Sequence, residues 1–232
     1  MTKLPARSGN ASVAAFLDKV ASMPAVRAGG AVGRLVFAVD ATASRQHAWD
    51  RACHLQAEMF LAARDLGGLA VQLAYWRGHG EFAATPFLTG AEELARRMSG
   101  VTVLGGMTQI GRALEHTLAE TKRQRVNALV LVGDAFEEDV DAVCHLAGQL
   151  GLHGTPAFCF QEGNDRTAEL GFRQVAKLSG GAWAPFDGSS ADALRDLLRA
   201  VAVFAAGGRA ALARLAGPGA RRLAGQLPAP GR

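Results

Sequence analysis

The chain has 232 residues, of which 49% are hydrophobic and 20% charged, a composition that suits one large α/β domain and excludes an intrinsically disordered chain. Its formal net charge is +4, but six arginines and no acidic residue follow Asp196. Residues 1–196 therefore carry 19 basic and 21 acidic side chains, a net charge of −2. The basic charge belongs to the C-terminal end, and no basic stripe with interleaved aromatic residues indicates a nucleic-acid partner.

The cysteines and the apolar runs indicate the cellular compartment of the protein. Cys53, Cys144 and Cys159 each stand alone in an apolar stretch, which favours a reducing compartment over a disulfide framework. The first residues lack the apolar core of a secretory signal, and the apolar run at 200–206 is too short to span a bilayer. We therefore expect a cytoplasmic protein.

The first part of the chain predicts a helix, a linker and then strands alternating with helices. Residues 34–40 are a continuous apolar run that ends in Asp40, which is typical of a parallel strand buried on both faces. Helices are indicated where apolar residues recur at helical spacing. In chain order, we expect a helix at 8–24, a strand at 34–40, a helix at 45–65, a strand at 69–76, a hairpin turn at 77–81 and a short strand at 82–87.

The same alternation continues to about residue 206. The expected elements are a helix at 90–98, a glycine-rich loop at 105–108, a helix at 109–123, strands at 128–132, 157–160 and 183–186, and helices at 138–150, 165–178 and 190–206. This order predicts a doubly wound, Rossmann-like α/β fold, whose mostly parallel sheet has one antiparallel edge strand and helices on both faces. We divide the chain into an N-terminal helix and linker (1–32), a main domain (33–206) and a tail rich in Arg, Ala, Gly and Pro (207–232), which we expect to be solvated.

Five oxygen-bearing side chains are expected at the carboxyl edge of this sheet, where open α/β sheets bind ligands. Asp40, Thr42 and Ser44 follow the first strand at alternate positions, Asp134 follows the strand at 128–132, and Thr108 follows Gly105-Gly106. Two carboxylates and several hydroxyls are the hard oxygen donors that Mg²⁺ prefers, with Mn²⁺ or Ca²⁺ as alternatives. The sequence therefore predicts a divalent-metal site, with one coordination position left for an Asp or Glu of a partner.

This pattern resembles the metal-ion-dependent adhesion site of von Willebrand factor A domains, over roughly residues 33–206. The resemblance implies a protein-binding adaptor that works through the metal, similar to the small stand-alone bacterial members of the family. It also implies an AAA+ ATPase or a chaperone-like protein as the partner. Two positions depart from the family pattern. Thr42 stands where serine is usual, and Gly133-Asp134 is followed by Ala-Phe instead of the commoner Asp-Gly turn.

Each of these residues also has a plain structural interpretation. Asp40 and Thr108 suit helix caps, and Asp134 suits a turn at a strand end. The four acidic residues that follow suit the first turn of a helix, where the helix dipole favours negative charge; they are Glu137, Glu138, Asp139 and Asp141. Three side chains are candidate partner contacts, namely His79 in the hairpin turn, Met107 and Glu137.

Two other functions compete with metal-dependent binding. In a scaffold the metal site would be vestigial and the surface would bind the partner. A phosphatase-like enzyme with Asp40 as nucleophile would need a second carboxylate two residues later as general acid, and Thr42 cannot do that. No Walker-type phosphate loop is present either. We therefore predict that the protein is not an enzyme.

Overall fold

The computed structural model describes residues 32–42, 68–186 and 191–228. The helices expected at 8–24 and 45–65 lie outside these residues, as does Ser44. The strands are β1 (Gly33–Asp40), β2 (Leu69–Arg77), β3 (Glu81–Ala84), β4 (Ala128–Gly133), β5 (Ala157–Glu162) and β6 (Ala182–Phe186). The helices are α3 (Ala91–Ser99), α4 (Ile110–Arg123), α5 (Val140–Leu152), α6 (Arg166–Ser179), α7 (Ala191–Arg214) and α8 (Pro218–Ala224).

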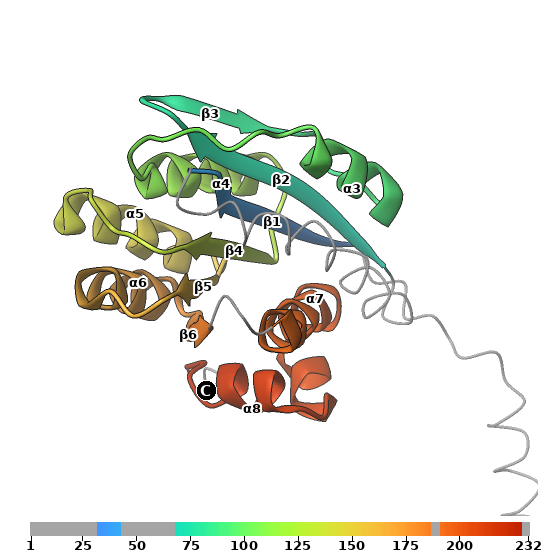
Figure 1. Ribbon diagram of the computed structural model, residues 1–232. Helices are drawn as coiled ribbons and strands as arrows, with labels where there is room; N and C mark the ends of the chain where they lie inside the picture. The colour runs from blue at the N-terminus through green and yellow to red at the C-terminus, as the bar shows by residue number, and fades with distance from the viewer. Residues whose placement is uncertain (1–31, 43–67, 187–190, 229–232) are drawn as a thin grey trace, which may run out of the picture.

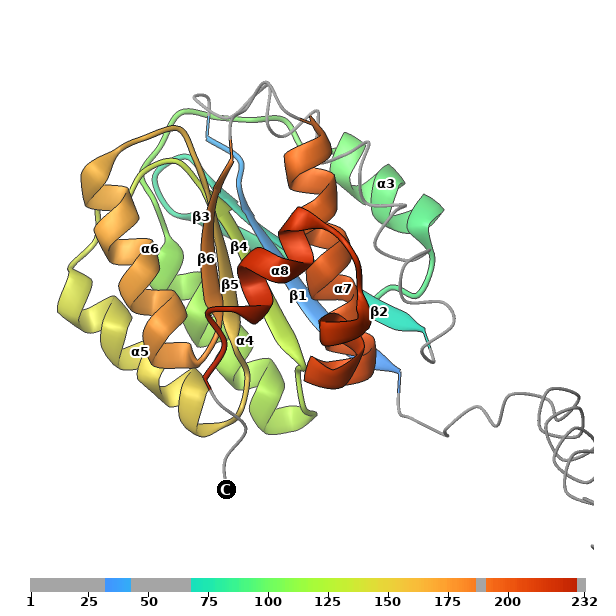
Figure 2. The ribbon, with the colours of Figure 1, turned by 90° about the horizontal axis from the view of Figure 1, so that it is seen from below.

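The six strands form one sheet in the order β3-β2-β1-β4-β5-β6 (Figure 1). All neighbouring strands are parallel except β3, which runs antiparallel to β2 at one edge. Helices α4, α5 and α6 cover one face, and α3, α7 and α8 cover the other (Figure 2). The predicted doubly wound sheet with one antiparallel edge strand is confirmed.

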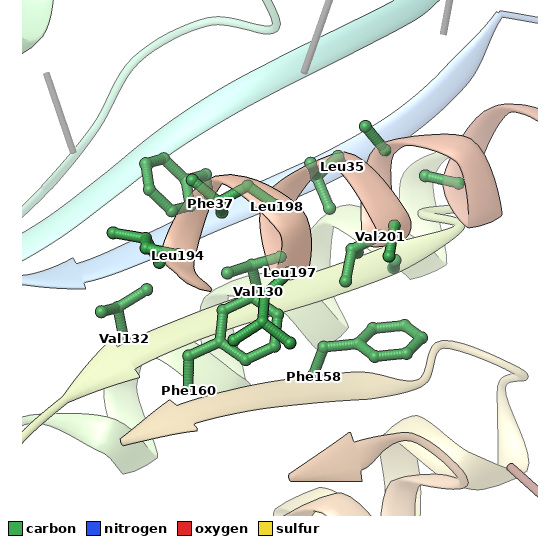
Figure 3. Packing of buried hydrophobic residues seen from close by; sticks show 14 of the residues in the cluster. Leu35, Phe37, Val130, Val132, Phe158, Phe160, Leu194, Leu197, Leu198 and Val201 are labelled. Atoms are coloured by element: carbon green, nitrogen blue, oxygen red, sulfur yellow. The ribbon is translucent and has the colours of Figure 1, made fainter. Parts of the chain in front are cut away.

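Strand β1 lies in the middle of the sheet and contributes to both cores. Leu35, Phe37 and Val39 face the α7 side, whereas Val36 and Ala38 face α4 and α5. This alternation follows from the two-residue period of a strand, and burial on both faces explains why the sequence is an unbroken apolar run. Figure 3 shows the first of these cores, in which side chains of β1, β4 and β5 meet Leu194, Leu198 and Val201 of α7.

The C-terminal segment differs from the prediction. We expected a helix that ends near 206 and a solvated tail after it, but α7 runs on to Arg214 with a break at Gly208, where φ is 69°. The chain then forms α8, whose Leu223 is fully buried and whose Ala220 is nearly so. The tail prediction was wrong because Arg221 and Arg222 are exposed on one side of α8 while the apolar residues pack under the sheet edge on the other.

The same segment closes the outer edge of β6. The side-chain amide of Gln226 accepts a hydrogen bond from Trp183 N at 2.9 Å and donates one to Trp183 O at 2.8 Å, as a neighbouring strand would. Pro185 has no N–H, and its carbonyl accepts a hydrogen bond from Arg222 Nη1 at 3.3 Å. These contacts use the backbone groups that an edge strand otherwise offers to another chain.

No single helix of the described part is long and apolar enough to cross a bilayer, although α7 and α8 together pass that test on length and composition across a 100° bend.

A histidine between α4 and the sheet makes stability depend on pH. The half-buried His116 Nε2 lies 2.9 Å from Gln72 Oε1, and its ring lies against Phe82. Burial lowers the pKa of His116, against the opposing effect of Glu120 and with a smaller contribution from Arg123. The unfolded chain therefore binds more protons than the folded one near the ordinary pKa of 6.5.

We expect the free energy of unfolding to fall as the pH is lowered from about 7 to about 5, and to fall less in His116→Gln. Urea denaturation of both proteins across this range measures the difference. Equal slopes in the two proteins would contradict the assignment to His116.

Candidate metal centre

Asp40 and Asp134 lie at the ends of neighbouring parallel strands. The last registered pair of β1 and β4 is Val39 and Val132. Asp40 follows Val39 directly, and Asp134 lies two residues after Val132. Adjacent strands in a sheet are about 4.8 Å apart, so this register brings the two carboxyl-bearing residues to the same point of the sheet edge. Asp40 is only 1% exposed, and Asp134 is half-buried.

The loop between α3 and α4 crosses this edge, which is at the top in Figure 2. Leu104 N donates a hydrogen bond to Ala41 O at 3.1 Å, and Leu104 O accepts one from Gly78 N at 3.3 Å. Gly106 lies so close to the β2–β3 turn that a Cβ on it would be 2.0 Å from Gly78 O. The glycine therefore permits a backbone contact that holds the loop over the ends of β1 and β2.

Thr108 is bonded to the loop after Asp134. Its hydroxyl accepts a hydrogen bond from Glu137 N at 3.1 Å, and its own N–H donates to Glu137 Oε2 at 2.9 Å. The alternative interpretation of Thr108 as a helix cap does not hold, because the N-cap of α4 is Gln109, which makes no side-chain capping bond. The structure thus places Asp40, Thr108 and Asp134 at the same edge of the sheet.

A second glutamate caps α4 from outside the helix. Glu138 accepts hydrogen bonds from Ile110 N and, at 2.7 Å, from Gly111 N. We expected Glu137 and Glu138 to lie in the first turn of the next helix, but α5 begins at Val140, after both of them. Of the four acidic residues, only Asp141 lies in the first turn of α5 as predicted, whereas Asp139 is the N-cap and accepts a hydrogen bond from Ala142 N at 2.8 Å.

Asp40 and Thr42 are both buried and form a local turn. Asp40 Oδ1 accepts a hydrogen bond from Thr42 N at 2.8 Å. This bond fits the turn interpretation of Asp40, and it also fixes the direction of its carboxylate at the sheet edge.

Solved structures similar to this chain share one fold. At the level of sequence, no protein-family model and no curated protein matches the chain. The VWA domain of SpRpn10 superposes with a TM-score of 0.54 at 11% identity, over 68% of this chain and 89% of that one. The pilus adhesin SpaC from Lactobacillus rhamnosus GG gives 0.58 at 12% identity, over 74% of this chain. The chain has the fold of a von Willebrand factor A (VWA) domain.

A further structure with this fold holds a metal. Proximal thread matrix protein 1 from the mussel byssus, described with a zinc-occupied MIDAS motif, gives a TM-score of 0.54 at 14% identity over 75% of this chain. This chain spans 46% of that protein and 29% of SpaC. The similarity therefore covers less than half of each of these two larger proteins, whereas it covers most of the SpRpn10 VWA domain.

The donor set of this VWA fold suits a divalent cation. Asp134 Oδ1 is buried and has no hydrogen-bond donor among the described residues. A buried carboxylate oxygen without a donor is costly, and a cation at the edge would remove that cost. The described residues contain no group of three His, Cys, Asp or Glu arranged for a metal, so the candidate donors are two carboxylates and hydroxyls. Such a set favours Mg²⁺, Mn²⁺ or Ca²⁺.

The three candidate partner contacts lie around this edge of the VWA fold. His79 is exposed in the β2–β3 turn, and Met107 is 55% exposed next to Thr108. Glu137 is exposed, but its carboxylate is engaged by Thr108 N. Leu104, which the sequence analysis did not single out, is 54% exposed on the same loop. An apolar residue beside Gly-Gly in a loop is the only sequence signal for it.

Proposed function

We propose that this chain is a protein-binding module that uses a divalent metal, Mg²⁺ in the first instance, to hold an acidic side chain of its partner. Asp40, Thr108 and Asp134 would hold the metal, together with Thr42 and, on sequence grounds, Ser44. The observation that carries the proposal is the buried Oδ1 of Asp134, which lies at the same sheet edge as Thr108 and has no hydrogen-bond donor among the described residues. When bound, the cation supplies a positive charge that a partner's carboxylate can share.

The protein's own hydrogen bonds orient two of the proposed metal donors. The hydroxyl of Thr108 accepts one hydrogen bond from Glu137 N, which orients the oxygen and leaves it a second lone pair. The Asp40 carboxylate is oriented by Thr42 N. Since these bonds form within the protein, little reorganisation is needed when a cation binds.

The type of partner is a narrower proposal. VWA structures similar to this chain include a pilus adhesin and the SpRpn10 domain, which supports a role in protein interaction. The resemblance to small bacterial VWA proteins suggests a cytoplasmic AAA+ ATPase or chaperone-like protein as the partner. A phosphatase-like enzyme is disfavoured because the position of its general acid is occupied by Thr42, which is buried.

The test is calorimetric titration of Mg²⁺ or Mn²⁺ into the wild type and Asp134→Asn. We expect the wild type to bind one ion and the variant to lose at least about tenfold in affinity, since one anionic donor becomes neutral. The metal-free variant should be no less stable than the wild type, because Asp134 Oδ1 accepts no hydrogen bond from the part of the chain that the structure describes.

Asp139→Asn is the matched control. It removes the same charge from the same loop, and asparagine keeps the capping bond to Ala142 N. We expect its metal affinity to stay within about twofold of the wild type. Equal affinity in the wild type and both variants would reject the metal site and would leave the scaffold function in its place.

A further inference from the structure

Two large apolar side chains are exposed directly beside the candidate metal centre. Leu104 and Met107 lie on the loop that ends in Thr108, and each exposes more than half of its surface. Two other exposed leucines of the described part, Leu152 and Leu178, lie in the last turns of helices that run back toward the opposite edge of the sheet, whereas Val140 and Leu170 lie near the beginnings of α5 and α6. An apolar pair at the rim of a polar site is typical of a contact surface.

The loop that presents this pair is held in place at three points. Leu104 is bonded through both its N–H and its C=O, to Ala41 and Gly78. Gly106 packs on the backbone of Gly78, and Thr108 is bonded twice to Glu137. The two side chains are therefore carried by a backbone that is already ordered, so a partner that covers them need not order the loop.

The surroundings of the metal centre differ between its two sides. On the loop that ends in Thr108 lie Leu104 and Met107, and Leu104 lies close to the β2–β3 turn, where a Cβ on Gly78 would be 3.1 Å from Leu104 Cδ2. On the side of α5 lie the exposed carboxylate-bearing residues Glu137, Asp139 and Asp141, with one smaller apolar side chain, the 39% exposed Val140, between the two aspartates. A partner's acidic residue that approaches the metal therefore meets two large apolar side chains on the loop and a mainly like-charged surface on the side of α5.

From this asymmetry we infer that Leu104 and Met107 form a specificity rim, which selects a protein segment with a large apolar side chain next to its metal-binding carboxylate. The inference rests on the proposed function and adds the chemistry of the partner to it. Met107 is the neighbour of Thr108 in the chain, so the apolar side chain lies within about two residues of the acid, roughly 7 Å along an extended segment. Further acidic residues on the α5 side of the segment are disfavoured.

The test is a selection from a library of random peptides on the immobilised full chain in the presence of Mg²⁺. We expect the selected peptides to be enriched in Asp or Glu followed or preceded closely by Leu, Met, Ile or Phe. The double variant Leu104→Ser/Met107→Ser should still select acidic peptides but lose the apolar enrichment by about tenfold. The double variant Leu152→Ser/Leu178→Ser, which removes two exposed leucines far from the site, should select as the wild type does.

The outcomes distinguish a failure of the specificity rim from a failure of the proposed function. Acidic enrichment without a neighbouring apolar residue, or apolar enrichment that persists in Leu104→Ser/Met107→Ser, overturns the rim and leaves the metal-dependent function standing. Acidic enrichment that persists in EDTA and in Asp134→Asn rejects the metal-dependent function, and the rim falls with it. The absence of any acidic or apolar enrichment overturns the rim as well.

Discussion

A chain that ends at Ala216 is expected to be less stable than the full chain by at least about 3 kcal/mol and to self-associate. The truncation removes α8, including Leu223, whose burial against α7 and the sheet contributes about 2–3 kcal/mol by itself. It also removes Gln226, so that Trp183 N and O at the edge of β6 lose their partners. An open strand edge pairs with other strands, which predicts association between copies of the truncated chain.

Urea denaturation and light scattering over a range of protein concentrations would measure the two effects. A chain that ends at Pro228 keeps every contact described for α8 and Gln226, and serves as the length control. In Gln226→Leu, α8 stays but the two hydrogen bonds to Trp183 are lost, so this variant reports on the edge alone. A monomeric and fully stable chain ending at Ala216 would show that α8 does not close the sheet.

Replacement of Gly106 by alanine is expected to weaken Mg²⁺ binding by more than about tenfold, whereas the same replacement at Gly105 should have little effect. A Cβ at Gly106 would meet Gly78 O at 2.0 Å, and both partners in that clash are backbone atoms. The loop must then move away from the β2–β3 turn, and Thr108 moves with it. A Cβ at Gly105 would have no atom of the described residues within 4 Å, so the neighbouring glycine is a matched control.

Calorimetric titration of the two variants with Mg²⁺ compares their affinities, and thermal unfolding without metal compares their stabilities. We expect Gly106→Ala to lose about 1–3 kcal/mol of stability as well, from the strain of the displaced loop. If Gly106→Ala binds Mg²⁺ like the wild type, the position of the Thr108 loop does not determine the site.

Much of the fold could be predicted because each buried strand carries its own signal. The run that ends at Asp40 and the later strands are unbroken apolar stretches between helical repeats, and such alternation has few topologies. The C-terminal segment could not be predicted in the same way. Its two arginines suggest solvent, and nothing local shows that Leu223 finds a place under α7 or that Gln226 lies beside β6.

The candidate site, too, could be predicted only in part. The direction of the predicted strands is enough to place Asp40, Thr108 and Asp134 at one edge, and this direction can be inferred from the sequence. The contacts that fix the edge depend on which loops become neighbours. Glu138 caps a helix that begins 28 residues before it in the chain, and Gly106 packs on Gly78 of a different turn. Neither pairing has a signal in the local sequence, so only the structure reveals them.

The central place of β1 has a consequence for the order in which the protein folds. β1 is the first described strand in the chain, yet one of its two neighbours, β4, lies far along the sequence, as in the bond between Arg34 and Asn127, 93 residues apart. Closing so long a loop costs entropy before any contact compensates for it. During synthesis, β1 can pair with β2 early, but its other side stays open until β4 has been made. We therefore expect the slowest folding step to be the joining of β4 to β1, and the newly made N-terminal half to be the stage most prone to aggregation.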